Sequence, residues 1–171
     1  MNSTRRIAIT ALAALAASIT QASVTAVPVF MEAGSGDVGS GGLLEMINSD
    51  NHRLVMTPTS TGGIRQYDLI VTLSNPLLMV GTYRRMEVRI EGTTSNSTVL
   101  MRSLMQVSNG TYEYLGAQTL PTSEAVRTRT FTGNMNRFIR PGGFVRLQLN
   151  GFFQQSFSHR FDRVSVVFFP N

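Results

Sequence analysis

The sequence predicts an all-β protein: an antiparallel β-sandwich of the jelly-roll type, with about eight strands after an N-terminal signal peptide. Residues 84–92 alternate between apolar Met86, Val88 and Ile90 and charged neighbours, which is the period of a strand with one buried face. Asn109-Gly110 joins two apolar runs and is typical of a hairpin turn, because both turn residues take positive φ. Short runs bounded by Gly, Pro and Asn recur along the chain without a helical period, which favours a sandwich.

The N-terminus has the pattern of a secretory signal peptide covering residues 1–22. Arg5 and Arg6 form a basic start, residues 7–19 are apolar and uncharged, and Thr20-Gln21-Ala22 supplies small residues for cleavage. The alternatives are a membrane anchor or a buried helix, but the apolar run is too short to span a bilayer comfortably. We therefore expect a bacterial protein that is secreted, periplasmic or on the cell surface, without a transmembrane segment after cleavage.

The rest of the chain divides into two parts. Residues 23–42 are a short apolar segment, a candidate first strand, followed by a glycine-rich stretch that we expect to be flexible. Residues 43–171 form the predicted sandwich domain. Its expected strands are the runs 53–57, 66–73, 84–92, 98–107, 112–115, 122–131, 144–149 and 160–169.

Composition excludes several chemistries. The chain has no Cys, which excludes disulfides, thiolate metal sites and cysteine nucleophiles. All 15 basic residues counted as Lys plus Arg are Arg, so lysine-dependent catalysis is excluded as well. The net charge of +5 falls to +3 when Arg5 and Arg6 are cleaved off, and this charge is spread along the chain. Such a charge is not the footprint of a nucleic-acid-binding protein.

The last strand raises the main question of local chemistry. Asp162 starts a row that continues with Val164, Val166 and Phe168, whereas Phe161 is expected on the opposite face. A carboxylate turned toward a core needs a charge partner, a metal ion or several backbone donors. The sequence favours an Arg or backbone partner for Asp162 and keeps a metal ion as the alternative.

Aromatic residues beside polar groups supply the candidate ligand-binding residues. Tyr112 and Tyr114 share one side of a strand, and Phe152 and Phe153 lie in an expected loop next to two glutamines. The alternative is that these rings pack in the core and its rim. Two histidines and no nucleophile-elbow motif give no catalytic signature, so we do not expect an enzyme.

Several short patterns resemble a group of secreted bacterial jelly-roll domains, related to the discoidin and galactose-binding-like sandwiches. The resemblance covers Gly39 to Phe169, with the patterns Gly39-Ser40-Gly41-Gly42, Ser49-Asp50-Asn51-His52-Arg53-Leu54, Glu91-Gly92-Thr93-Thr94-Ser95, Ser108 to Leu115, Gly143 to Leu147, and Phe161 to Val166. The group usually has a Trp where this chain has Tyr112, and often a second Asp where it has Asn51. Related domains bind carbohydrate, although a fold alone does not fix function.

The resemblance also implies a candidate structural calcium near the chain ends, as sandwiches of this kind often carry one. Its expected oxygen ligands are Asp50 and Asp162, with Asn48 and Asn51 beside them. No other cofactor is expected.

Two functional classes remain. The first is a non-catalytic exported binding or adhesion module, for a glycan or a cell-surface partner. The second is a structural or assembly domain of the bacterial envelope without a small-molecule ligand.

Overall fold

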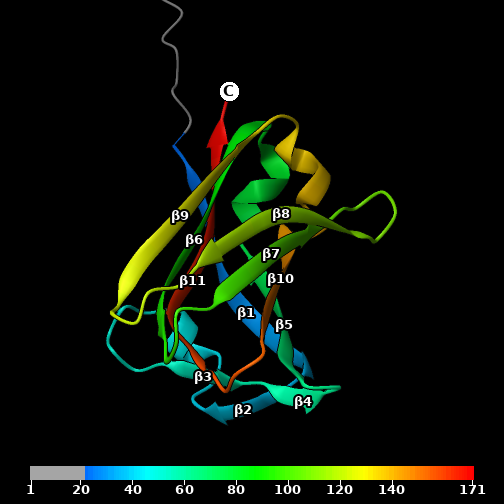
Figure 1. The fold of residues 1–171 in the computed structure, drawn as a ribbon. Coiled ribbons are helices and arrows are strands. Elements are labelled where there is room, and N and C mark those ends of the chain that lie inside the picture. The colour runs from blue at the N-terminus through cyan, green and yellow to red at the C-terminus, as the bar shows by residue number, and fades with distance from the viewer. Residues whose placement is uncertain (1–21) are drawn as a thin grey trace, which may run out of the picture.

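The computed structural model describes residues 22–171, so the predicted signal peptide lies almost wholly outside the described residues. The described chain forms eleven strands and three short 3-10 helices (Figure 1). The strands are β1 (Val24–Ser35), β2 (Asp37–Ser40), β3 (Leu54–Thr57), β4 (Thr59–Thr61), β5 (Ile64–Ser74), β6 (Tyr83–Thr94), β7 (Val99–Met105), β8 (Tyr112–Thr119), β9 (Ala125–Thr132), β10 (Phe144–Phe153) and β11 (His159–Pro170). The 3-10 helices are η1 (Leu44–Met46), η2 (Pro76–Val80) and η3 (Met135–Phe138).

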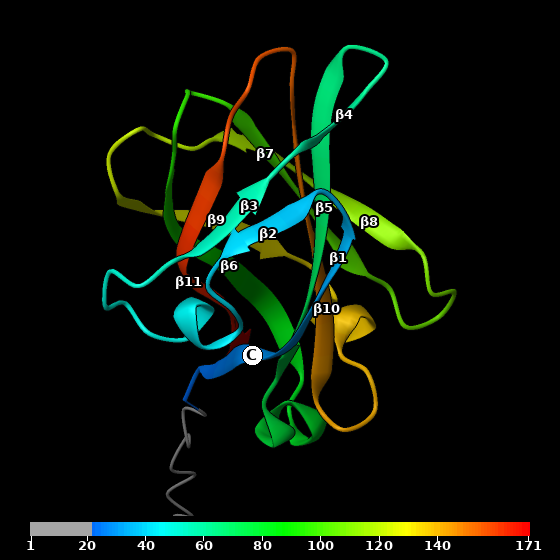
Figure 2. The ribbon, with the colours of Figure 1, turned by 90° about the horizontal axis from the view of Figure 1, so that it is seen from below.

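The strands pair into two antiparallel sheets, which confirms the predicted β-sandwich. Sheet A has the order β2-β3-β11-β6-β9, and sheet B has the order β1-β5-β10-β7-β8, with β4 paired to the start of β5. β1 belongs to both sheets, because its first residues pair with the C-terminal half of β11 and the rest pairs with β5. Figure 2 shows β2, β3 and β4 together at the near end of the sandwich.

The core lies between the sheets and is built from the alternating rows that the sequence predicts. Sheet A contributes Met86, Val88 and Ile90 of β6, all buried, as the alternation in residues 84–92 indicates. Sheet B contributes the buried rows of β5 and β10, which are Leu69, Val71, Leu73, Val145, Leu147 and Leu149. Burying each such side chain stabilises the fold by roughly 1.5–3 kcal/mol relative to an exposed one.

The glycine-rich stretch is not the flexible segment that the sequence predicts. β1 runs to Ser35 and β2 pairs with β3, so residues 24–40 are part of the sheets. Gly36 makes the turn between them at φ +78°, and a Cβ there would lie 2.5 Å from the Cβ of Tyr67. Glycine is needed here because the turn is left-handed and the chain approaches Tyr67 closely. Composition alone cannot distinguish this structural role of glycine from a role in a flexible segment.

The predicted loop at Phe152 and Phe153 is instead the end of β10. β10 continues past Leu149 because its partners β5 and β7 continue with it, as far as the pair between Phe153 and Arg65. Gly151 allows this continuation, since a Cβ there would lie 2.4 Å from a ring carbon of Tyr67.

The predicted faces of the last strand are wrong at Phe161. The pairing of β11 with β6 shifts between Phe161 and Arg163, so Asp162 is the extra residue of a β-bulge. Because the bulge adds one residue, the alternation of side chains shifts by one position at Asp162. Phe161 therefore packs in the core on the same side as Val164. Asp162 is buried as expected, with 1% of its surface exposed, but it does not belong to the apolar row.

Within residues 22–171, the structure contains no helix long and apolar enough to cross a bilayer.

Candidate functional site

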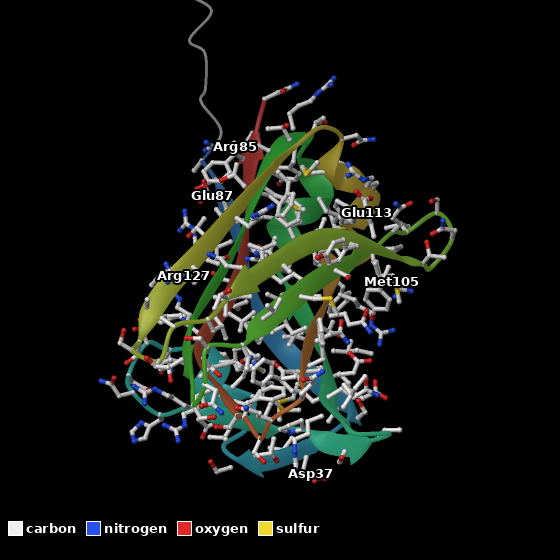
Figure 3. All side chains as sticks on the ribbon, viewed as in Figure 1. Asp37, Arg85, Glu87, Met105, Glu113 and Arg127 are labelled. Carbon is white, nitrogen blue, oxygen red and sulfur yellow. The ribbon has the colours of Figure 1, made fainter. Side chains whose placement is uncertain are left out.

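The outward-facing side of sheet B gathers the aromatic and polar side chains that the sequence places on separate strands. Directly opposite residues of paired strands share a face. Met105 is opposite Tyr112, and Ser103 is opposite Tyr114 on one side and Gln148 on the other. Asn150 in turn lies opposite Met101 and Asp68. We call this surface the outer face of sheet B; Figure 3 labels Met105 on it.

Three of the four predicted ligand-binding residues lie on the outer face of sheet B. Tyr114 is 59% exposed and Phe152 is 44% exposed, while Tyr112 is half-buried. Phe153 does not join them, because it follows Phe152 in the same strand and so turns to the other face, where it packs against the core.

Two aromatic residues of this face were missed by the sequence analysis. Phe30 of β1 pairs with Thr72, Phe144 of β10 pairs with Ser74, and both rings are exposed. The signal for Phe144 was present, since it alternates in phase with the outward-facing Arg146 and Gln148. Phe30 carries no such signal, because β1 is irregular between Pro28 and Phe30.

A fixed group of hydrogen bonds lies at the centre of the outer face of sheet B. The Nε2 of Gln148 and the Nδ2 of Asn150 both donate to the Asp68 carboxylate, each at 3.0 Å. A hollow of about 510 Å³ beside this group is lined by Gln66, Asp68, Met101, Asn150 and Phe152, among others. A second hollow of about 480 Å³ is lined by Thr72, Arg140, Pro141, Phe144 and Arg146.

The outer face of sheet B also holds polar atoms without partners. The hydroxyl of Tyr112 is buried and lacks a hydrogen-bond partner among the described residues, and burial raises its pKa. The Nε of Arg146 is likewise buried and unpartnered. Unsatisfied polar atoms beside exposed rings are suited to a ligand that offers both hydroxyl groups and apolar ring faces.

The carboxylate of Asp162 accepts hydrogen bonds from backbone N–H groups, one of the two kinds of partner that the sequence favours. The N–H of Asp50 donates to its Oδ1 at 3.4 Å, and the N–H of Asn51 donates to its Oδ2 at 3.3 Å. The carboxylate of Asp50 instead accepts a hydrogen bond from the N–H of His52, and it is not one of the carboxylates that lie beside Asp162.

Two other acids lie beside Asp162 and were missed by the sequence analysis. Single carboxylate oxygens of Glu91, Glu124 and Asp162 lie within 4.8 Å of one another. Burial raises the pKa of Asp162, with the neighbouring Glu124 adding to the effect. The Arg53 guanidinium, 2.6 Å from Glu124, lowers the pKa of that carboxyl. Glu91, Glu124 and Asp162 come from three strands or loops far apart in sequence, so no local pattern predicts the group.

The donor set of this acidic group fits a hard cation. Three carboxylates offer the oxygen ligands that Ca²⁺ prefers, and one of them is buried in a fixed position. The structure places Glu91 and Glu124, and not the carboxylate of Asp50, beside Asp162, while calcium at this place stays a prediction.

His159 belongs to a buried polar network rather than to a catalytic pair. Its Nδ1 bonds the hydroxyl of Tyr67 at 2.5 Å and its Nε2 bonds the hydroxyl of Thr98 at 2.6 Å. The Thr98 hydroxyl also contacts that of Thr94 at 3.0 Å. Both ring nitrogens of His159 are therefore engaged, and neither contacts Asp162.

Comparison with known proteins gives structural neighbours only. No protein-family model and no curated protein matches the chain. The solved "xylan-binding module CBM15" matches with a TM-score of 0.55 and 9% identity, over 86% of this chain and 97% of that module. The structure of "TmCBM61 in complex with beta-1,4-galactotriose" matches with a TM-score of 0.48 and 8% identity, over 82% and 88% of the two chains.

A third neighbour, from "CBM4 structure and function", matches with a TM-score of 0.47 and 16% identity, over 81% of this chain and 94% of that chain. At 9% identity and a TM-score of 0.55, the match to the CBM15 module shows the fold alone. The chain has the jelly-roll β-sandwich fold that the sequence predicts.

Proposed function

We propose that the protein is an exported, non-catalytic module that binds a glycan through the outer face of sheet B. The observation that supports this most is the presence on one face of exposed Tyr114 and Phe152, half-buried Tyr112 and the Asp68–Gln148–Asn150 group. The chain also shares its fold with a module named as xylan-binding. The predicted signal peptide would place it in the periplasm, at the cell surface or outside the cell.

The geometry suits a chain of sugar rings. Phe152 borders the hollow that contains Asp68 and Asn150, so a ring packed on Phe152 would have hydroxyls within reach of these groups. Asp68 is held by two amides and is thus oriented before binding, which reduces the ordering cost of a complex.

The first prediction is that Phe152→Ala and Tyr114→Ala each weaken glycan binding by about tenfold, which corresponds to ~1.4 kcal/mol of lost ring contact. A glycan array that includes xylan and β-1,4-galactan fragments first identifies a ligand. Isothermal titration calorimetry then measures the affinity of the wild type and the variants for it. Val126→Ala is the control, because Val126 is an exposed apolar residue on the outward side of sheet A. Affinity unchanged in both aromatic variants would place the binding surface elsewhere.

The alternative function is a structural or assembly domain of the envelope without a small-molecule ligand. It is favoured by the exposed apolar side chains Leu77, Met79 and Val80, which η2 presents at one end of the sandwich. This alternative predicts self-association in size-exclusion chromatography that Leu77→Ser with Val80→Ser abolishes, together with no binding on the array.

The second prediction concerns export. A fusion of residues 1–26 to a reporter enzyme is expected to carry the reporter out of the bacterial cytoplasm, because the basic start and the apolar run have the features of a signal peptide. Replacement of the apolar run by polar residues is the control and should keep the reporter inside. Cytoplasmic retention of the unaltered fusion would contradict the proposed localisation.

A further inference from the structure

Two arginines of β9, the edge strand of sheet A, lie on its inner face, where Arg127 is partly buried and Arg129 is exposed. In β9, Arg127 is opposite Ile90 and Arg129 is opposite Val88, and both partners belong to the buried row of β6. Phe131 of β9 continues the same row and packs against the core. Arg127 and Arg129 therefore occupy positions that an apolar residue would normally take. Figure 3 labels Arg127 on β9.

A third arginine points inward from sheet B. Arg102 lies between the buried Leu100 and Leu104 of β7, and it is opposite the buried Leu149 of β10. Only 1% of its surface is exposed, which makes it one of the largest fully buried side chains of the described chain. Its Nε and Nη2 have no hydrogen-bond partner among residues 22–171. A buried guanidinium without a partner is costly, so such groups normally pair with an anion.

The arginines of the two sheets approach each other across the open side of the sandwich, where β8 and β9 are the edge strands. The Nη2 of Arg129 lies 3.3 Å from the position that a Cβ on Gly116 of β8 would take. Gly116 sits at φ +101°, at the bulge where β8 faces Arg102 of β7. A side chain at Gly116 would occupy the space that the Arg129 guanidinium now reaches.

The charges of these arginines are not compensated within the described chain. Burial and the neighbouring Arg129 lower the pKa of Arg102 to about 10, so its guanidinium stays protonated at pH 7. The Nε of Arg127 is also buried and unpartnered. The ion pairs of the described residues involve other basic groups, namely His52, Arg53, Arg89, Arg137 and Arg146.

We propose that Arg102, Arg127 and Arg129 form a binding site for an oxyanion, a carboxylate or sulfate group, at the open edge between β8 and β9. Guanidinium groups present several N–H donors in a planar fork, which matches the oxygens of such anions. The anion would satisfy the unpartnered Nε and Nη2 of Arg102 and reduce the repulsion between Arg102 and Arg129. Two sources carry this chemistry: an acidic sugar of a glycan and a free inorganic anion.

The site lies beside the proposed glycan-binding face without being part of it. Tyr114 of β8 is two residues from Gly116, which lies beside the Arg129 guanidinium, and its exposed ring belongs to the outer face of sheet B. A uronate or sulfated residue at one end of a bound glycan could therefore place its acid group at the arginines. Oxyanion binding does not depend on that function, since sulfate alone tests it.

The test is calorimetric titration of the mature protein with sodium sulfate, at constant ionic strength maintained with chloride. We expect binding of one sulfate per chain, and at least a tenfold loss of affinity in Arg129→Gln. Arg129 is exposed, so this change should leave the fold intact. Arg160→Gln is the matched control, because Arg160 is an exposed arginine of β11, which β6 separates from β9 in sheet A, and it should bind like the wild type.

A second arm distinguishes the two sources. Trigalacturonate and its neutral methyl ester are titrated alongside sulfate. If trigalacturonate binds ten times more tightly than sulfate and its ester does not, the ligand is an acidic glycan. If trigalacturonate and sulfate bind with equal affinity, the ligand is a free oxyanion. No binding of either anion, or equal binding to wild type and Arg129→Gln, overturns the proposal. Arg102→Met is a further variant: it is expected to raise the urea midpoint without anion and to remove the response to sulfate.

Discussion

His159→Gln is expected to lower the free energy of unfolding at pH 7 by ~2–4 kcal/mol, because the glutamine amide carries both polar atoms at its end and cannot place them where the Nδ1 and Nε2 of the imidazole bond their two partners. His159 joins the Tyr67 hydroxyl on one strand to the Thr98 hydroxyl before another, inside the core. Its ring also packs edge-on against Tyr67 and lies 5.0 Å from the Phe157 ring, measured between centroids. Urea unfolding of both proteins measures the difference.

The same substitution should change how stability depends on pH. Burial lowers the pKa of His159 from its ordinary 6.5 to about 3 in the folded state. The unfolded chain therefore binds a proton below pH 6.5 that the folded chain does not bind until about pH 3. The wild type should lose stability as the pH falls through this range, approaching ~1.4 kcal/mol per pH unit from this group.

Comparison of the two proteins isolates the contribution of His159. Glu113 and Glu124, whose pKa values are lowered by Arg137 and Arg53, also cost stability in acid, but they are present in both proteins. The wild type should therefore have the steeper loss of stability between pH 6.5 and 4. Parallel curves for wild type and His159→Gln would show that the imidazole is not buried and neutral.

The fold could be predicted where buried and exposed residues alternate in the sequence. Met86, Val88 and Ile90 show this directly, and their row is buried in the structure. The prediction was wrong where glycine serves as a spacer. Gly36 and Gly151 allow close contacts with Tyr67, and these depend on which strand lies opposite, which the local sequence does not contain.

The candidate site was likewise predictable only where the local sequence pattern defines which face of a strand a residue lies on. Tyr112 and Tyr114 share a face because they are two residues apart in one strand, so period two was sufficient. Phe153 was misplaced, because the end of β10 is set by its pairing with β5 and β7. Glu91 and Glu124 approach Asp162 through the pairing of β6 with β11 and β9, which is information about contacts distant in sequence.

Asp162→Ala is expected to lower the free energy of unfolding by ~2–4 kcal/mol, somewhat less than the ~3–5 kcal/mol typical of breaking a buried ion pair. The substitution leaves the N–H groups of Asp50 and Asn51 without their acceptor at the β11 bulge. The gain from separating Asp162 from Glu91 and Glu124 offsets part of this loss, since the three carboxylates repel one another when no cation is bound.

A chelator distinguishes the two kinds of partner that Asp162 can have, a calcium ion and the backbone N–H donors. If calcium is bound, the chelator EDTA lowers the urea midpoint of the wild type and has no effect on Asp162→Ala. Glu124→Gln should then lose the response too, whereas Asp50→Ala should keep it, because the Asp50 carboxylate is outside the acidic group. If the backbone donors act alone, EDTA changes none of the four midpoints, and Asp162→Ala is still the least stable. A midpoint of Asp162→Ala equal to that of the wild type, with and without EDTA, would mean that the carboxylate is exposed and that the bulge does not bury it.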